Sequence, residues 1–342
     1  MTIEIESLSR WAASLPLFDG ALPNLMPVSA SSGGALFTAE WPGGKAALKL
    51  FADGGESRPL ALRAANRARA AAEGLRIFAP QGIAPALLWE GSLPGENTGT
   101  FAVVYRWVED TGTLPLTMLN DAEAELYVDT LLRVHNEETP LKLLSPNPRN
   151  LEDWWLKTHE QYRDLEPQLA VGLPPSVYDT LARLIQSVAG DAQTHKRFWR
   201  GTPLRAVHGE PLSQNVVLDA DRTHMTLVSW QRFGLGDPAY EIASAIRQWD
   251  TPTAEALTAR YLAGVEDPAM GLRVEIYRRV LPFSSIVTTL SAAGKREGGW
   301  ESSIVEDLHV CLETYGWSAP AISSTLRDMQ EWGAGQPGTA GS

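Results

Sequence analysis

The sequence predicts an α+β fold in two lobes, with a small strand-rich first lobe and a larger, mostly helical second lobe. The segments run from strands through one long helix to more strands and then to helices. One short strand-rich segment, near residues 205–230, interrupts the later helices. No G-x-G-x-x-G follows a strand, and no G-x-x-x-x-G-K-[ST] is present, so a Rossmann or P-loop fold is not expected.

The first strands fall within residues 24–50. The stretches NLMPVSASSGG, ALFTAEW and AALKLF are separated by a glycine-bearing loop and by a Pro-Gly-Gly turn at residues 42–44, which predicts a β-hairpin after the loop. Residues 60–78 are rich in alanine, leucine and arginine and contain no proline, so a helix is favoured there.

A second strand pair follows, and helices dominate after it. ALLWEGS and TGTFAVVYRWV flank the turn-rich LPGEN, and the residues at 103–108 suit a buried strand. Asn120 followed by Glu123 predicts a capping box that opens a helix. We expect a first lobe at 1–108, a second at 109–332, and a disordered glycine-rich tail at 333–342.

Composition narrows the possible partners and compartment. The net charge of -12, from 41 acidic and 29 basic side chains, disfavours binding to nucleic acid or anionic lipid. It favours a generally acidic, soluble surface, with an acidic pocket for a cationic substrate as the alternative. The sequence shows neither a secretory signal nor a membrane-spanning stretch, and Cys311 is the one cysteine. These features predict a cytoplasmic protein without membrane contact.

The segment at 206–243 carries the chemistry. His208-Gly209-x-x-x-x-x-Asn215 resembles the loop H-G-D-x-x-x-x-N of aminoglycoside phosphotransferases and choline kinases. VSWQ at 228–231 resembles their I-D-W-E strand, and GDPAYEIA at 236–243 resembles their G-D-P-x-Y-D-L-A. This resemblance implies a bilobed, protein-kinase-like fold and an ATP-dependent phosphotransferase that acts on the hydroxyl of a small molecule.

The resemblance also implies sites in the first lobe. Lys49 in AALKLF is similar to the third-strand lysine, and residues 31–34 are similar to the nucleotide loop, with Ser32, Gly33 and Gly34 as binding residues. Glu73, on the predicted helix, is our candidate partner for Lys49. A solvent-facing role is an equal alternative for Glu73.

In the catalytic segment, the resemblance places Glu210 at the residue that orients the acceptor hydroxyl. It places Asn215 and Ser229 at the positions of metal ligands. His208 is also a candidate catalytic residue, and we expect its imidazole to fix the loop through hydrogen bonds. Phosphoryl transfer needs these roles separately because it depends on positioning and charge neutralisation. We expect Asp237 to cap the following helix and most tryptophans to lie in the core.

Three positions depart from the pattern. Glu210 replaces an aspartate and keeps its charge, whereas Ser229 and Gln231 replace two acidic residues and lose it. A hydroxyl is a weak ligand for Mg²⁺, which prefers carboxylates, so Mg²⁺ binding is doubtful. We therefore carry three hypotheses: a phosphotransferase with impaired or unusual catalysis, a pseudokinase that acts as a ligand-binding or regulatory module, and transfer of a different group. Sugars, aminoglycosides, choline-like compounds and amino alcohols all stay open as acceptors.

Overall fold

The structure is a computed structural model that describes residues 4–31, 34–53, 63–93, 99–109, 119–195, 202–293 and 301–334. The chain divides into two compact units. Unit 1 comprises Met1–Asn147, Leu204–Glu241 and Ala245–Val265, and unit 2 comprises Pro148–Pro203, Ile242–Ser244 and Glu266–Ser342. Every residue of the predicted site that the structure describes belongs to unit 1.

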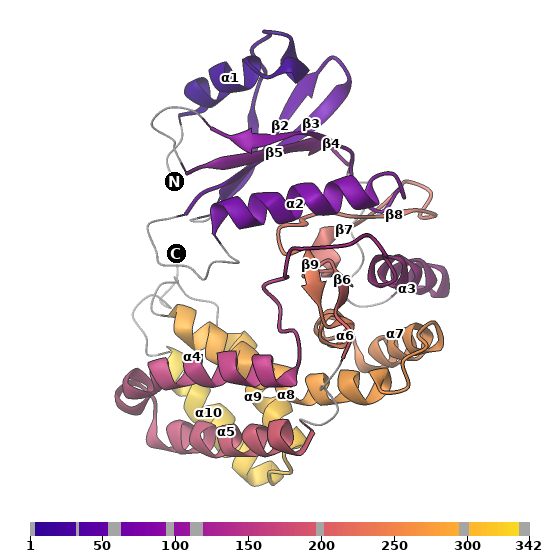
Figure 1. Cartoon of the computed structure of the whole chain (residues 1–342). Helices are drawn as coiled ribbons and strands as arrows, with labels where there is room; N and C mark the ends of the chain where they lie inside the picture. Colours follow the sequence, from indigo (N-terminus) through magenta and orange to yellow (C-terminus); the bar gives the residue numbers. More distant parts are fainter. Residues whose placement is uncertain are drawn as a thin grey trace. The chain divides into compact units, whose positions relative to one another are not determined.

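Unit 1 contains a five-stranded antiparallel sheet (Figure 1). Its strands, in spatial order, are β1 (Met26–Ser31), β2 (Gly34–Trp41), β3 (Gly44–Phe51), β5 (Phe101–Arg106) and β4 (Leu87–Ser92). The turn at residues 42–43 joins β2 to β3, which confirms the predicted hairpin. Lys49 lies at the centre, paired with Leu36 on β2 and Val103 on β5.

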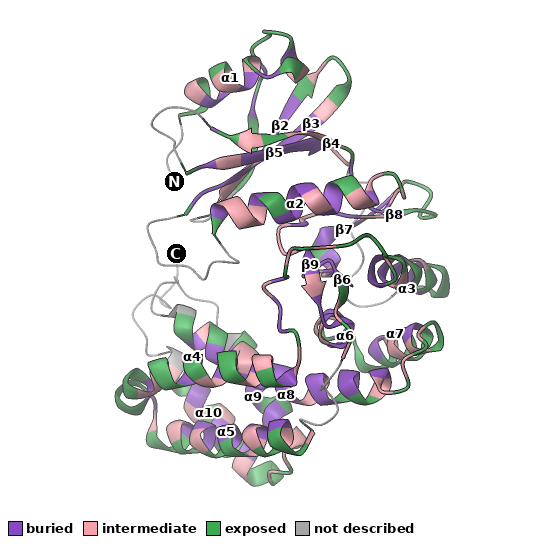
Figure 2. Ribbon diagram, viewed as in Figure 1, coloured by how far each residue is buried: buried purple, intermediate pink, exposed green. Residues whose placement is uncertain are grey.

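Helices cover both faces of this sheet (Figure 1). On one face, α1 (Ile5–Ala13) and the 3₁₀ turn η1 (Pro16–Phe18) contribute Leu8 and Phe18 to a core that includes Leu48 and Leu50. On the other face, α2 (Ala64–Phe78) packs against β3, β4 and β5. Because side chains alternate along a strand, Lys49 points away from the core that contains Leu48 and Leu50. Figure 2 shows β3 and β5 as mostly buried.

Helix α2 packs closely on the segment that follows β8. A Cβ built on Gly74 would lie 2.6 Å from a ring carbon of Trp230, so only glycine allows this approach. The ring of Phe78 stacks on the ring of Trp230 with centroids 4.9 Å apart. Trp230 is buried, as expected, and thereby fixes α2 beside Ser229 and Gln231.

The rest of unit 1 holds short strands and helices around the catalytic segment. These elements are α3 (Asp121–His135), β6 (Arg205–Val207), the 3₁₀ turn η5 (Ser213–Asn215), β7 (Val216–Leu218), β8 (Met225–Leu227), β9 (Gly234–Gly236) and α7 (Thr251–Ala263). Asn120 and Glu123 form the predicted capping box of α3. Asp237 caps α6 (Pro238–Ile246) by accepting a hydrogen bond from the amide of Ala239, also as predicted.

Unit 2 is mostly helical in its described part, with short connections between the helices. Its helices are α4 (Leu151–Gly172), α5 (Pro175–His195), α8 (Met270–Ala293), α9 (Glu301–Thr314) and α10 (Ala319–Ala334). Trp154 on α4 is buried, and Tyr162 of the same helix contacts the ring of Phe283 on α8. Within the residues described, no helix has the length and apolar character needed to cross a membrane.

Candidate functional site: a kinase-like cleft with altered charges

The loop after β6 has a backbone that requires glycine at one position. Gly209 has a φ of 95°, and a Cβ built there would lie 2.4 Å from the Cβ of Arg232. Later in the loop, the side-chain amide of Asn215 donates to the carbonyl oxygen of Glu210 over 2.9 Å. This hydrogen bond ties the backbone of Glu210 to the later part of the loop.

Glu241 braces this loop from below. Its buried carboxylate accepts hydrogen bonds from the backbone amides of His208 and Gly209. His135 Nε2 lies 2.7 Å from Glu241 Oε2, and the hydroxyl of Tyr261 lies 2.6 Å from His135 Nδ1. No pattern in the sequence predicted this link between α3, α6 and α7.

His208 joins the loop to the strand segment on its other side. The side chain is fully buried, and burial lowers its pKa, which favours the neutral imidazole. Nε2 lies 2.9 Å from the carbonyl oxygen of Val228, and Nδ1 accepts from the amide of Glu210 over 3.3 Å. Both ring nitrogens are therefore used to hold backbone, which agrees with a supporting role rather than that of a base.

One row of side chains connects the two halves of the site. The amine of Lys49 donates to Oε1 of Gln231 over 2.7 Å, and the amide nitrogen of Gln231 lies 3.4 Å from Glu210 Oε2. The other carboxylate oxygen of Glu210 pairs with Nε of Arg232 at 3.0 Å. Lys49 and Glu210, two of the predicted site residues, are thus separated by a single side chain.

The surroundings of Lys49 are more cationic than the sequence suggested. Burial lowers the pKa of Lys49 to about 8, with Glu210 acting in the opposite direction and Arg67 adding to the decrease. Among the described residues, no hydrogen bond or ion pair joins Lys49 to Glu73. Gln231 takes the place of that partner as the hydrogen-bond acceptor, and the charged residue of α2 that acts on Lys49 is Arg67.

Ser229 retains an unusual backbone at the predicted metal position. Its φ of 69° lies in the left-handed region, which costs a non-glycine residue of order 1–3 kcal/mol and recurs at functional sites. The hydroxyl of Ser229 and the side-chain amide of Asn215 would offer a metal ion only neutral ligand atoms, and Glu210 is already paired with Arg232. Across the described ranges, no cluster of three histidine, cysteine or acidic side chains could hold a metal ion. This donor set does not fit Mg²⁺, which is bound chiefly through carboxylates and phosphates.

The predicted nucleotide loop lies mostly outside the described residues, because Ser32 and Gly33 fall in a gap. Gly34 begins β2, and a Cβ built there would lie 2.1 Å from the carbonyl oxygen of Leu50. This close approach of β2 to β3 explains the glycine structurally. A role of the loop in nucleotide binding stays a prediction.

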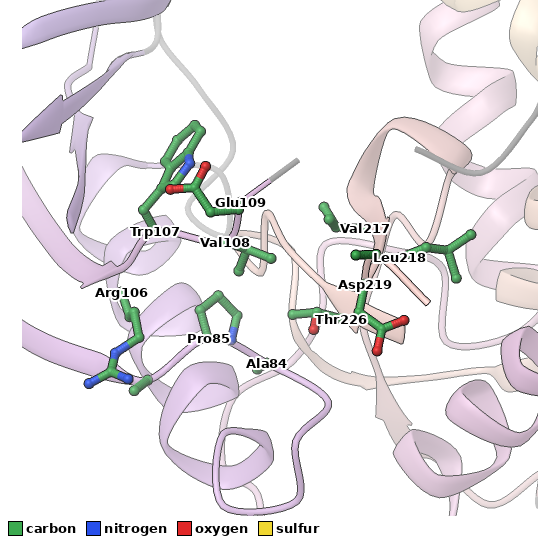
Figure 3. A pocket seen from close by; sticks show the side chains of 12 residues that line it. Ala84, Pro85, Arg106, Trp107, Val108, Glu109, Val217, Leu218, Asp219 and Thr226 are labelled. Atoms are coloured by element: carbon green, nitrogen blue, oxygen red, sulfur yellow. The ribbon is translucent and has the colours of Figure 1, made fainter. Parts of the chain in front are cut away.

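A pocket of about 420 Å³ lies where β5 leaves the sheet. It is lined by residues 84–86, 106–109, 217–220 and Thr226. In Figure 3, Val108 and Pro85 point into the pocket from one side, and Val217 and Thr226 face them from the other. The lining includes Arg106, which lies three residues after Val103, the partner of Lys49 on β5. It also includes Val217, which lies two residues after Asn215. No sequence motif predicted this pocket, because its walls come from segments that are distant in sequence.

A family model matches most of the chain, and solved structures share its fold. The sequence model of the phosphotransferase enzyme family, APH, matches residues 37–281. A choline/ethanolamine kinase family protein from Mesorhizobium loti is 19% identical, with 96% of this chain and 100% of that chain covered and a TM-score of 0.63. No curated protein sequence matches the chain.

Two further solved structures show the same fold. Choline kinase from Cryptosporidium parvum is 9% identical, with 91% of this chain and 93% of that chain covered and a TM-score of 0.60. An aminoglycoside phosphotransferase from Streptomyces rimosus is 19% identical, with 83% and 99% covered and a TM-score of 0.50. These matches confirm the predicted kinase-like fold, and the chain belongs to the phosphotransferase enzyme family.

Proposed function

We propose that this protein transfers the γ-phosphoryl group of ATP to a hydroxyl of a small molecule. The observation that carries the proposal is the row Lys49–Gln231–Glu210, which places a phosphate-binding cation one side chain away from a carboxylate. Phosphoryl transfer needs both functions in one site, because the cation holds the phosphates while the carboxylate orients the attacking oxygen.

The chain's residues divide the work as follows. Lys49 holds the phosphates of the nucleotide. Glu210 accepts the proton of the acceptor hydroxyl, and the oxygen of that hydroxyl bonds to the γ-phosphorus. The bond from this phosphorus to the bridging oxygen breaks, and ADP leaves. Arg232 fixes the carboxylate of Glu210 through its Nε contact, and Glu241 holds the loop backbone on which Glu210 is carried.

The pocket beside β5 is our candidate for the nucleotide base. Its volume lies in the range of small-molecule sites, and Pro85, Val108 and Val217 offer apolar surface to a planar ring. Two structures of one related protein support a nucleotide ligand, since thermostable mutants of an aminoglycoside phosphotransferase have been solved with ADP and hygromycin B and with AMP-PNP and hygromycin B. We expect Val217→Trp to fill the pocket and weaken ATP binding at least about tenfold.

A second candidate function is a pseudokinase that binds a ligand without turnover. The neutral Ser229 and Gln231 favour it, because both lack the negative charge that the family resemblance places there. Fold alone cannot separate the two functions, because the residues that changed are the site residues themselves.

A turnover assay tests the proposal. Purified protein is incubated with ATP and a panel of sugars, amino alcohols, choline and aminoglycosides, and ADP release is compared with that of Glu210→Gln. The proposal expects acceptor-dependent ADP release that falls at least about a hundredfold in the variant, because misplaced or missing catalytic groups commonly cost that much. ATP binding without acceptor-dependent release for any compound would favour the pseudokinase.

A further inference from the structure

Resting on this proposed function, we propose that Arg67 and Lys49 together hold the phosphate chain of ATP and replace metal ions in neutralising it. The cleft would then bind ATP without a divalent cation. The residue Arg67 matches no motif in the sequence, and only the folded structure brings it to the site.

The position proposed for the phosphates lacks the negative charge that the family resemblance places there. Ser229 and Gln231 are neutral, and Gln231 already uses its amide oxygen to accept from Lys49. Glu210 divides its carboxylate between Arg232 and Gln231. A dication placed here would meet one carboxylate that is already paired, so little favours its binding.

Helix α2 adds a positive charge beside Lys49. The guanidinium of Arg67 lies 5.5 Å from the centroid of the Phe51 ring, and the amine of Lys49 lies 5.9 Å from the same centroid. Nη2 of Arg67 donates to the carbonyl oxygen of Ala52 over 2.9 Å, which fixes the guanidinium at the end of β3. Two cations therefore contact one ring, and Arg67 disfavours the protonated form of Lys49.

The positive charges of Lys49 and Arg67 repel each other. Arg67 acts on Lys49 as a like charge and lowers the pKa of its amine, whereas Glu210, which pairs with Arg232, raises it. Neighbouring like charges in a partly buried site repel each other until an anion binds between them. A polyphosphate supplies that anion, and a guanidinium is well suited to it because it binds phosphate oxygens in a two-pronged manner.

Calorimetric titration of ATP tests this, with EDTA and then with excess magnesium, on the wild type and on Arg67→Gln, Arg67→Lys and Arg69→Gln. Arg69 is the matched control because it lies on the same helix and is exposed. We expect the same wild-type affinity within about twofold in both buffers. In EDTA, Arg67→Gln should weaken binding at least about tenfold, Arg67→Lys by less, and Arg69→Gln not at all. Circular dichroism checks that each variant is folded.

Three results would overturn the inference. The first is wild-type binding that needs magnesium, or gains about tenfold or more from it, which leaves the proposed function intact. The second is a folded Arg67→Gln protein that binds ATP as tightly as the wild type in EDTA. The third is no ATP binding by the wild type in either buffer, which removes the proposed function as well. The magnesium comparison therefore separates failure of this inference from failure of the function on which it rests.

Discussion

The affinity for ATP should depend on pH through one residue, Lys49. Burial lowers the pKa of its amine to about 8, so the free protein loses this charge within an accessible range. The phosphates of ATP favour the charged amine. Affinity is therefore full below pH 8 and is lost as the pH rises through 8, unlike that of an exposed lysine, which keeps its charge to about pH 10.

The size of the effect follows from the protonated fraction. With a pKa of about 8, about nine tenths of the Lys49 amines carry a proton at about pH 7 and about one tenth at about pH 9. If the amine is fully protonated when ATP is bound, the affinity should fall about tenfold over this interval, or about 1.4 kcal/mol.

The assay is a series of ATP titrations in EDTA between about pH 7 and pH 9.5, a range that lies above the second pKa of a phosphate group, about 6. Lys49→Arg is the control, because a guanidinium keeps its charge throughout and should give a flat profile. A wild-type profile as flat as that of Lys49→Arg up to about pH 9 would refute the assignment of Lys49 as a buried phosphate ligand.

Three other substitutions probe the supports of the site. Glu241→Gln should lower the free energy of unfolding in urea by about 2–3 kcal/mol, because a buried carboxylate that accepts from two loop amides is lost, and unchanged stability would contradict the brace. Gly74→Ala should destabilise the fold by about 1–2 kcal/mol despite its better helix propensity, because the new Cβ meets Trp230; a more stable variant would show that α2 can shift. The double change Ser229→Asp with Glu210→Asp should raise phosphoryl transfer in magnesium, measured as ADP release, and no gain would argue against a scaffold that recently lost its metal site.

Local patterns let the sequence predict much of the fold. The hairpin around residues 42–44, the capping box at Asn120 and the helix cap at Asp237 each depend on neighbours within a few residues, and the structure has all three. Helix α1 was not predicted from the sequence, although its residues Leu8 and Ala12 belong to the core that also contains Leu48 and Leu50. A short amphipathic helix gives a weak signal until the surface that it covers is known.

The site itself was only partly predictable because its contacts are distant in sequence. Lys49 and Gln231 are separated by 182 positions, and no pattern in either segment indicates that they meet. Whether Glu73 can pair with Lys49 depends on how α2 is rotated about its axis against β3. That rotation is set by the packing between Gly74 and Trp230, which the sequence does not reveal. For the same reason Arg67 gave no signal in the sequence. Resemblance located the residue types, and tertiary packing decided which of them lie together.

The most direct test of the central claim is ATP binding by the wild type and by Lys49→Ala, titrated side by side in the calorimeter. If the cleft holds the phosphates through Lys49, the wild type binds at micromolar to millimolar levels and the variant loses at least about tenfold. Equal affinity of the two folded proteins would show that ATP does not bind at Lys49 and would contradict the phosphotransferase cleft described above.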